Sequence, residues 1–556
     1  MVRNNRKLEL NWYNKDKSLF YDPDKKEYLW VDKKDPRVSE PRILLEKSSC
    51  GESRSKNMLI KGDNLLALKA LVPDFQNSIK LIYIDPPFNT GAAFEFYDDG
   101  LEHSIWLTMI RDRLDLLKKL LRKDGVIFVH IDNHEVGNLK VLMDEIFMPK
   151  NFVQMISEKR ASPAGFKTIN PGPLTVTDYI LMYAKDKEYL NWKPQYIPVG
   201  YDENYDLFIE NKNDSPENWK LKKINDLNFE KEGISGWQEA KEKWGEEWKL
   251  IRSSKAATFA LKNADRVVSI RDPHKPSDAI KNLLEKSKNN RDKIFVLKRN
   301  NGKGDIYIIN GGSLSFYKNK IREVDGRLSP TELLTDLWTD MNYAGIANEG
   351  GVQFKNSKKP EMLLKRIIEM SSEPGDWILD SFAGSGTTAA VAHKLNRNWI
   401  AIELGNHSVT HIIPRMKNVV SGEDQGGISK IIGWKGGGGF KYFELGDSLF
   451  VQDEDLRYTI INPKMYNGAL VRAVLKIEGF KLLNPDNGLH GISGTTVAHV
   501  TEQYLTQEYI DVLINEIGDR AKYLVVYAKT ISSKLEIPEN VEIKRIPNVL
   551  LNKFSI

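Results

Sequence analysis

Short apolar runs alternate with helical patterns in two separate stretches of this chain of 556 residues. In the first stretch, the runs NMLI, KLIYI and VIFVHI are each followed by a segment with a periodic apolar face, such as the one formed by Ile110, Leu114 and Leu117. In the second stretch, the runs WIL and NWIAI flank a glycine turn and a helix-like segment. Strands that alternate with helices predict a parallel sheet covered by helices on both faces. The expected fold class is therefore α/β.

The alternation also predicts how the chain is divided. It is absent between residues 156 and 335, where the sequence is rich in Lys, Asn and Trp and has only short strand-like pieces. We therefore expect one α/β domain that is split by an insertion. The predicted parts are an N-terminal extension (1–55), the first half of the core (56–155), the insertion (156–335), the second half of the core (336–420), a glycine-rich linker (421–444) and a separate α/β domain (445–556).

Composition excludes several classes of protein. The chain has 41% hydrophobic and 28% charged residues, which is typical of soluble globular proteins. No apolar run reaches the roughly 18 residues of a transmembrane helix, and the first residues lack the apolar core of a signal peptide, so we expect a cytoplasmic protein. The single cysteine, Cys50, cannot form an internal disulfide and argues against structural zinc, so no metal is expected. A formal net charge of +5 permits nucleic-acid binding without requiring it.

Four apolar runs stop at or just before an acidic residue: Asp63, Asp85, Asp380 and Glu403. Ligands of open α/β sheets bind at the carboxyl ends of the strands, so residues at these positions are candidates for a site. Each acid taken alone is better explained as a helix cap or a solvated loop residue, and Asp63 is placed to cap the helix that follows it. The shared position of all four predicts a binding site.

The segment DSFAGSGTT, residues 380–388, places Gly384 and Gly386 between a strand and a helix. A backbone without side chains lets a ligand approach closely at such a turn. The turn is not a phosphate-binding P-loop, because the lysine of that motif is missing. Glu403 follows at nearly the spacing of about 20 residues at which an acid accepts hydrogen bonds from a ribose in dinucleotide-binding folds. The turn therefore favours a cofactor that contains a nucleoside.

The sequence Asp85-Pro86-Pro87-Phe88 follows the apolar run KLIYI. Two prolines fix two φ angles and remove two N–H donors, so the Asp85 carboxylate and the Pro86 carbonyl can both face a ligand as acceptors. An amino group, with two hydrogens on one nitrogen, is the matching partner. Phe88 offers a ring face on which a base removed from its helix can stack. The alternative interpretation is a plain turn with a buried aromatic residue.

Together, the DPPF and FAGSG motifs resemble those of amino-group DNA methyltransferases that use S-adenosylmethionine, in the permuted β-type order. The segments KGDNLLALKAL, IKLIYIDPPFNTG, GVIFVHIDNHE, KKPEMLLKRIIEM, LDSFAGSGTT and GGGGFKYFEL are similar to the modification subunit of type III restriction–modification systems. The resemblance covers most of residues 10–150 and 335–450. It implies a permuted Rossmann-like S-adenosylmethionine-dependent methyltransferase domain, with an inserted target-recognition domain and a C-terminal α/β domain.

The resemblance implies roles for individual residues. The catalytic residues would be Asp85, Pro86, Pro87 and Phe88. The cofactor-binding residues would be Asp63 and Asn64 beside the adenine ring, Glu403 on the ribose, and Asp380, Ser381, Phe382, Gly384, Gly386 and Thr387 in the turn on the methionine side. The family commonly has tyrosine at position 88, so phenylalanine keeps the stacking face and lacks the hydroxyl. For His130 and Asp132, in a strand-end segment shared with the family, we expect a structural role.

These observations predict an enzyme that transfers a methyl group from S-adenosylmethionine to N6 of a flipped adenine in double-stranded DNA. Aspartate at position 85, rather than serine or asparagine, favours adenine. The alternatives are another acceptor, namely cytosine N4, RNA or a protein amide, and a non-catalytic DNA-recognition subunit. Methylation at C5 of cytosine is excluded, because Cys50 lies away from any strand-end turn. The partners implied by the resemblance are DNA, a restriction (helicase–nuclease) subunit and a second copy of the chain.

The insertion is where we expect the DNA sequence to be read. A core that must hold a flipped base has little surface left for its neighbours. The insertion carries clusters of Lys, Arg and Asn, which pair with phosphates and base edges. These clusters are Lys159-Arg160, residues 251–266 and residues 296–304 with Lys298, Arg299, Asn300 and Asn301.

Overall fold

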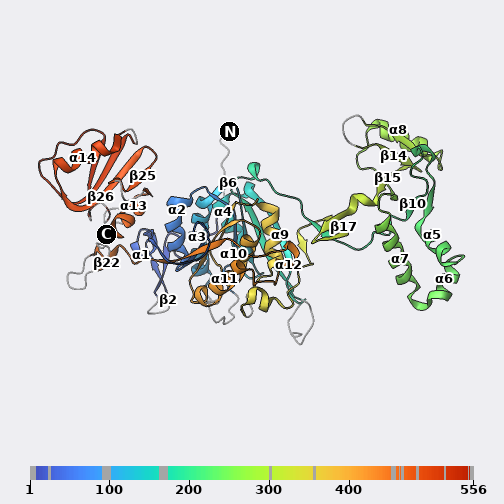
Figure 1. Ribbon diagram of the computed structural model, residues 1–556, viewed down its shortest axis with the longest axis horizontal. Helices are drawn as coiled ribbons and strands as arrows, with labels where there is room; N and C mark the ends of the chain where they lie inside the picture. Colours follow the sequence, from blue (N-terminus) through green and yellow to red (C-terminus); the bar gives the residue numbers. More distant parts are fainter. Residues whose placement is uncertain are drawn as a thin grey trace. The chain divides into compact units, whose positions relative to one another are not determined.

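The computed structural model describes residues 8–22, 27–89, 102–161, 173–299, 304–354, 358–452, 459–462, 464, 469–483, 488–518, 521–546, 548 and 550. The chain divides into two compact units. The first unit comprises Met1–Lys193 and Thr335–Ile556, and the second is Pro194–Leu334. In Figure 1 the second unit is coloured green to yellow.

A ten-stranded mixed sheet forms the centre of the first unit, with the strand order β18-β7-β8-β6-β5-β19-β20-β4-β21-β3. The bounds of these strands in chain order are β3 (Leu44–Gly51), β4 (Met58–Lys61), β5 (Ile79–Ile84), β6 (Leu121–Ile131), β7 (Phe152–Lys159), β8 (Thr177–Ala184), β18 (Leu337–Trp338), β19 (Trp377–Asp380), β20 (Asn398–Glu403) and β21 (Gly439–Leu445). The six consecutive strands from β6 to β21 are parallel.

Helices cover both faces of this sheet. Every residue of β5 is buried, which requires cover above and below the strand. Helices α2, α3 and α4 pack together, and α9, α10 and α11 form a second group (Figure 1). The bounds are α2 (Asn64–Phe75), α3 (His103–Leu120), α4 (Val136–Phe147), α9 (Glu361–Ser371), α10 (Thr387–Lys394), α11 (Ile413–Ser421) and the short α12 (Ser429–Ile432). The predicted α/β fold class is confirmed.

The strand order shows why the alternating pattern occurs in two stretches. β19 and β20, from the second stretch, lie between β5 and β4, from the first. The two halves of the core therefore interleave in one sheet, as the permuted order of the motifs predicts. Residues far apart in the sequence meet at the ends of neighbouring strands.

Residues outside the two predicted stretches also enter the sheet. β3 belongs to the N-terminal extension, which further contains the hairpin β1 (Ser18–Asp22) and β2 (Glu27–Val31) and the short helix α1 (Pro36–Ser39). β21 belongs to the segment predicted as a linker, and it pairs with both β4 and β3. A Cβ atom at Gly439 would lie 2.5 Å from Cys50 O, so the missing side chain is what permits this close pairing. Glycine in this predicted linker therefore allows β21 to pack closely against β3.

The second unit begins later than the predicted insertion, because β7 and β8 pair with each other and belong to the central sheet. It contains a six-stranded sheet, β11-β10-β12-β15-β14-β13, and a three-stranded sheet, β16-β17-β9. The bounds are β9 (Tyr196–Pro198), β10 (Leu207–Ile209), β11 (Leu221–Lys223), α5 (Ile224–Glu232), α6 (Trp237–Trp244), α7 (Trp248–Lys262), β12 (Val267–Arg271), α8 (Asp278–Lys288), β13 (Phe295–Leu297), β14 (Ile306–Ile309), β15 (Gly312–Phe316), β16 (Ile321–Val324) and β17 (Arg327–Leu333).

The residues after β21 form a smaller sheet with the order β24-β25-β26-β27-β28 and a separate hairpin, β22–β23. The bounds are β22 (Phe450–Gln452), β23 (Thr459–Ile461), α13 (Ala469–Ile477), β24 (Lys481–Leu482), β25 (Gly491–Ser493), β26 (Thr496–Leu505), α14 (Gln507–Ile517), β27 (Tyr523–Ile531) and β28 (Val541–Arg545). β26, β27 and β28 are parallel, so this part is also α/β.

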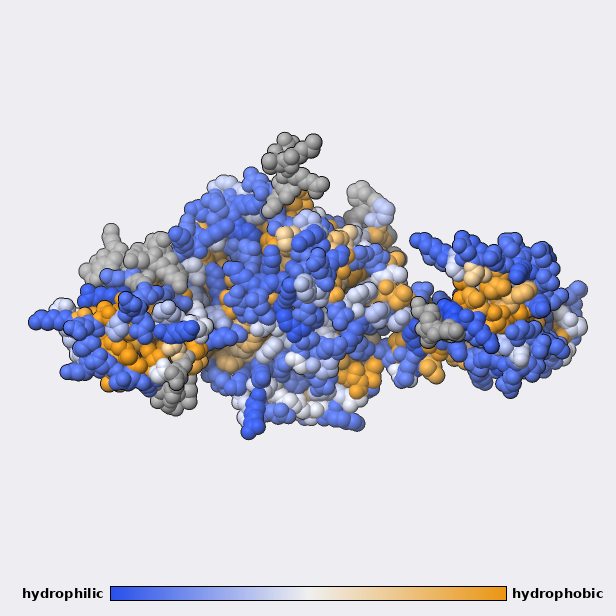
Figure 2. Space-filling model, turned by 90° about the horizontal axis from the view of Figure 1, so that it is seen from above, coloured by the Kyte–Doolittle hydropathy of each residue, from blue (hydrophilic) through white to orange (hydrophobic). Residues whose placement is uncertain are grey.

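The face of the molecule seen in Figure 2 is largely hydrophilic, with hydrophobic areas on both units. In the second unit the exposed large apolar side chains include Trp237, Leu250 and Leu261. Among the residues that the structure describes, no helix is both long and apolar enough to cross a membrane. The same residues contain no group of three or more side chains that could hold a metal ion.

Candidate active site

The carboxyl ends of β5, β19, β20 and β4 form one edge of the sheet, because these strands are adjacent and parallel. Asp380 and Glu403 are the last residues of β19 and β20. Asp85 directly follows β5, and Asp63 follows β4 after Gly62. The structure thus brings all four strand-end acids to the same edge, where an open α/β sheet binds its ligands.

Glu403 organises the glycine turn between β19 and α10. Its Oε2 atom accepts a hydrogen bond of 2.7 Å from the Gly384 N–H. Its Oε1 atom accepts one of 3.1 Å from the Gly405 N–H and lies 3.0 Å from His407 Nε2. The carboxylate is nearly inaccessible, with 3% of its surface exposed. The buried Glu403 carboxylate therefore holds the glycine turn, where the cofactor is predicted to bind, in a fixed conformation.

Asp380 lies beside that turn and has an unusual acidity. Burial, together with the negative charges of Asp85 and Glu403, raises the pKa of Asp380 to about 7. Hydrogen bonds from Thr388 Oγ1 (2.6 Å) and the Phe382 N–H (2.9 Å) oppose this shift. The carboxyl group can therefore gain or lose a proton near neutral pH, and a cation bound beside it would favour the ionised form.

The two predicted glycines of the turn differ in their surroundings. Gly386 has φ of +76°, and a Cβ atom there would lie 2.8 Å from Ile412 Cγ2. Gly384 has φ of +52°, but a Cβ atom there would meet only Phe382 O, at 3.9 Å. Gly386 is therefore needed for packing inside the protein, whereas Gly384 opens onto unfilled space at the strand edge.

The turn after β4 is joined to the glycine turn by side chains. Asp63 caps α2 by accepting from the Leu66 N–H at 3.1 Å, and Asn64 Nδ2 donates to Ser381 O at 2.7 Å. The buried Arg113 of α3 donates to Asp63 Oδ2 at 3.1 Å and also to Asn64 Oδ1. One arginine therefore orients both residues that the sequence assigns to the adenine ring.

The DPPF turn is held from behind by α3 and α4. The indole N–H of Trp106, which is fully buried, donates to Pro87 O at 2.8 Å. Asn89 adopts a positive φ of 62°, and its Nδ2 donates to the buried Glu135 at 2.8 Å. The Phe88 ring stacks on His130, with ring centroids 5.9 Å apart and 22° between the planes. Thr90 and Gly91, which end this motif in the sequence, lie outside the described residues.

His130 belongs to a buried polar cluster beneath Phe88. Its Nδ1 atom lies 3.0 Å from the Tyr83 hydroxyl, and its Nε2 atom lies 3.6 Å from Glu158 and 3.5 Å from Asp178. Burial raises the pKa of Tyr83 well above its usual value. Burial would also raise the pKa of Asp178, but contact with His130 and the charges of Lys359 and Arg160 together lower that pKa. The cluster supports the stacking ring, which agrees with the structural role expected for His130.

A second buried cluster lies behind the glycine turn. Arg415 donates to Thr387 Oγ1 at 2.8 Å and to Glu361 Oε1 at 2.7 Å, and all of these side chains are buried. Lys394 pairs with Glu361 at 2.8 Å and with Asp424 at 2.7 Å. Thr387, predicted as a cofactor contact, thus has its hydroxyl bonded to protein groups of this cluster.

Lys359 is a site residue that the sequence did not reveal. Its Nζ atom lies 3.0 Å from Asp85 Oδ1 and 4.8 Å from the centroid of the Phe88 ring. The sequence also did not reveal four further residues that support the site: Arg113, Trp106, Glu135 and Arg415. Several of them lie in or beside segments that resemble the methyltransferase family, such as GVIFVHIDNHE and KKPEMLLKRIIEM. A single sequence does not show which buried charges in such segments will meet.

The basic clusters predicted to read DNA are partly engaged within the protein. Arg160 pairs with Asp178 at 2.9 Å and lies in the first unit. Arg266 donates to Ile209 O, and Arg299 donates to Gly304 O. Asn300 and Asn301 lie outside the described residues. No single cluster stands out as a reader of bases.

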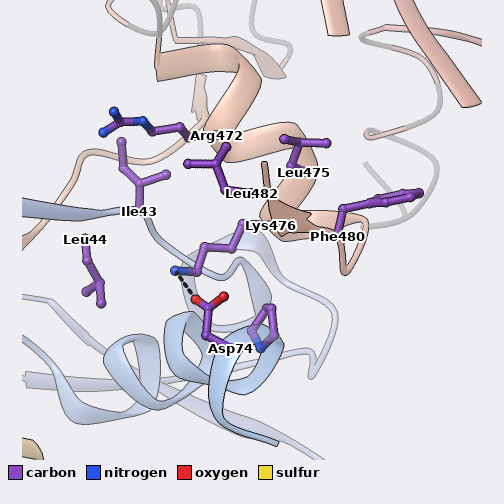
Figure 3. A pocket seen from close by; sticks show the side chains of 9 residues that line it. Ile43, Leu44, Asp74, Arg472, Leu475, Lys476, Phe480 and Leu482 are labelled. Atoms are coloured by element: carbon purple, nitrogen blue, oxygen red, sulfur yellow. Dashed lines mark ion pairs between the residues drawn. The ribbon is translucent and has the colours of Figure 1, made fainter. Parts of the chain in front are cut away.

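A pocket away from the strand edge lies between the end of α2, the start of β3 and helix α13 (Figure 3). Lys476 points toward Asp74 there, with Nζ 3.8 Å from Oδ2. None of the strand-end acids lines this pocket. The candidate site therefore lies at the sheet edge and not in this pocket.

This chain is similar to several known proteins. The "Probable type III restriction-modification enzyme HindVI Mod subunit" of Haemophilus influenzae is 36% identical over 70% of this chain and 54% of its own length. The "Type II methyltransferase M.EcaI" of Enterobacter cloacae is 30% identical over 62% of this chain and 66% of its own. The solved PvuII DNA methyltransferase (cytosine-N4-specific) is 14% identical with a TM-score of 0.32, over 69% of this chain and 95% of that one.

The chain thus spans about half the length of the HindVI relative that it matches. The family model described as DNA methylase matches residues 79–414, which include the DPPF turn, the glycine turn and Glu403. This match extends over more than half of the chain. The chain belongs to the DNA methylase family.

Proposed function

We propose that this chain transfers a methyl group from S-adenosylmethionine to N6 of an adenine in double-stranded DNA. The observation that carries the proposal is the meeting of two turns at one sheet edge. The DPPF turn supplies the Asp85 carboxylate and the Phe88 ring directly after β5, and the glycine turn follows Asp380 at the end of β19, which pairs in parallel with β5. An acceptor group and a cofactor bound to these turns would be neighbours.

The residues of the glycine turn suit S-adenosylmethionine. This cofactor carries a sulfonium, an ammonium group and ribose hydroxyls, and the edge offers the carboxyl groups of Asp63, Asp380 and Glu403. Ser381 Oγ is buried and has no hydrogen-bond partner among the described residues, which is the mark of a group that a ligand would satisfy. Gly384 leaves open space beside it. When bound, the cofactor supplies an electrophilic methyl group.

The protein's part in the reaction is to prepare the acceptor nitrogen. The adenine amino group is a poor nucleophile because its lone pair is delocalised into the ring. If Asp85 and the Pro86 carbonyl accept its two hydrogens, the lone pair is directed away from the ring toward the methyl group. Stacking on Phe88 would hold the flipped base in place. Transfer would then be direct, with no covalent enzyme intermediate.

The first test is methyl transfer itself. Purified protein is incubated with tritium-labelled S-adenosylmethionine and, in parallel, with unmethylated duplex DNA, the same DNA as single strands, and RNA. We expect label to enter duplex DNA and to be absent from RNA. Label in RNA alone would show that the acceptor is RNA and not DNA. Binding of DNA without label in any acceptor would favour a non-catalytic recognition subunit.

We further propose that the chain acts as the modification subunit of a type III restriction–modification system in the cytoplasm. The name of the HindVI relative supports this assignment, as does the resemblance of the quoted segments. A restriction subunit and a second copy of the chain would be its partners. Sedimentation of the purified chain, alone and with a candidate helicase–nuclease, tests both: a monomer that binds no such subunit would contradict them.

We assign target recognition to the residues of the second unit, Pro194–Leu334. The unit is a compact module with its own sheet and helices, and so it can be exchanged as a whole. Replacing it with the corresponding unit of a related enzyme should change the methylated sequence and leave cofactor affinity unaltered. An active chimera that still methylates the original sequence would show that recognition lies outside the second unit, and residues 445–556 would then be the candidate.

A further inference from the structure

Lys359 connects the two groups that the proposed reaction uses on the acceptor side. Its ammonium group is 3.0 Å from Asp85 Oδ1 and lies over the ring of Phe88, 4.8 Å from the centroid. The lysine side chain is 13% exposed and the Asp85 side chain 19%. Such a partly buried ion pair is screened less by water than a surface pair. The lysine therefore fixes the carboxylate and the ring relative to each other.

The lysine contact is made to the buried Oδ1 atom of Asp85. This atom lies 3.0 Å from Lys359 Nζ as an ion pair, and no described group makes a hydrogen bond to it. An ion pair at one oxygen favours one direction of the carboxylate. For an amino group that must donate to Asp85 and to Pro86 O at the same time, that direction decides whether both hydrogen bonds form.

Lys359 is itself anchored to the other side of the site. It precedes Pro360, the N-cap of α9, whose φ is −64°, and Glu361 follows as the first residue of that helix. Glu361 is fully buried and pairs with Arg415 and Lys394, and Arg415 bonds to Ser385 O and Thr387 Oγ1 of the glycine turn. The segment Lys359–Glu361 thus touches the DPPF turn with its first residue and the support of the glycine turn with its last.

We infer that Lys359 is a positioning residue for methyl transfer: it aims the Asp85 carboxylate at the target amino group and, through Pro360 and Glu361, ties that carboxylate to the glycine turn that holds the cofactor. This inference rests on the proposed function. Lys359 acts through Asp85 and Phe88 and makes no contact with the methyl group. Its removal should slow the transfer step and leave the binding of S-adenosylmethionine as it is.

The test is a kinetic comparison of Lys359→Met, Lys359→Arg and wild type, with tritium-labelled S-adenosylmethionine and unmethylated duplex DNA. We expect Lys359→Met to lower kcat at least tenfold, because geometry at the reacting centre is lost. The KM for DNA and the Kd for the cofactor, measured by calorimetry, should stay within twofold of wild type. Lys359→Arg keeps the cation and should recover most of kcat.

A lysine of another ion pair serves as the control. Lys441 of β21 pairs with Glu46 of β3 at 3.0 Å, and neither residue is among those of the candidate site, so Lys441→Met should leave kcat unchanged. A purely structural role for Lys359 would instead lower the unfolding midpoint and reduce the folded fraction in proportion to activity. If Lys359→Met does not fold, Lys359→Gln, which is one atom shorter and keeps a hydrogen-bond donor, is measured by the same criteria.

Three results would overturn the inference while wild type remains active. They are a kcat of Lys359→Met within twofold of wild type, a loss of cofactor affinity that equals the loss of kcat, and a Lys359→Arg variant as slow as Lys359→Met. Wild-type protein that transfers no methyl group to any acceptor would instead reject the proposed function. The two failures are therefore distinguishable.

Discussion

The DPPF turn and the glycine turn lie at the same sheet edge but are constructed in opposite ways. The first is made rigid by two prolines and is held by side chains, with Trp106 on Pro87 O and Lys359 on Asp85. The second is made of glycines with positive φ and is held through its backbone, with the Gly384 N–H bonded to Glu403. The acceptor side therefore presents fixed side chains, while the cofactor side presents open backbone. We expect substitutions in the DPPF turn to lower turnover and substitutions in the glycine turn to lower cofactor affinity.

Replacing Asp85 with alanine should have the largest effect. It removes the acceptor that prepares the amino group, and the loss of one preorganised contact of this kind costs about 10²–10³ in rate. Turnover in Asp85→Ala should fall to background, while cofactor affinity measured by calorimetry stays near that of wild type. Wild-type turnover in this variant would remove the DPPF turn from the chemistry.

The opposite pattern is expected on the cofactor side. Glu403→Gln keeps the shape of the side chain and removes its charge, and a hydrogen bond to a charged group contributes about 1.5–3 kcal/mol. Cofactor affinity should fall by roughly 10-fold to 100-fold, since 1.4 kcal/mol corresponds to tenfold. DNA affinity, measured by fluorescence anisotropy, should barely change. Equal cofactor affinity in mutant and wild type would separate Glu403 from the ribose.

The two glycines sharpen the comparison within one turn. Gly386→Ala places a Cβ atom 2.8 Å from Ile412 on a left-handed backbone, so it should lower the free energy of unfolding by about 2–5 kcal/mol. Gly384→Ala meets open space and should cost less stability, about 1–2 kcal/mol for its left-handed backbone. Its main effect should be weaker cofactor binding. Denaturant unfolding and calorimetry on both variants check this; a Gly384→Ala variant with full cofactor affinity would place the cofactor elsewhere.

The smallest expected effect concerns pH. The pKa of Asp380 is about 7, so its carboxyl group is mostly protonated at pH 6 and mostly ionised at pH 8. A positively charged cofactor favours the ionised form, and its affinity should rise with pH through this window by less than about tenfold per pH unit. Calorimetry at pH 7 in buffers of different ionisation enthalpy should show proton release on binding. Asp380→Asn should lose both the pH dependence of cofactor affinity and the proton release. If the variant keeps them, the released proton comes from another group.

The sequence predicted the strands and turns of the site far better than their supports. The apolar runs that end at Asp85, Asp380 and Glu403 are local signals, and parallel pairing brings their ends together. The supports depend on contacts between distant segments. One buried cluster contains Glu361, Lys394, Arg415 and Asp424, which come from four separate segments of the chain. The segment predicted as a linker contains β21, which packs closely on β3. Glycine composition alone does not distinguish a free loop from such a strand.

The most direct test of the central claim, that Asp85 prepares an adenine amino group for methylation, is sequencing that maps modified bases. Unmethylated duplex DNA is exposed to S-adenosylmethionine with wild-type protein or with Asp85→Ala. We expect N6-methyladenine within one recurring sequence after treatment with wild type, and none after treatment with the variant. Modified cytosine in place of adenine, or the same adenine marks with Asp85→Ala, would contradict it.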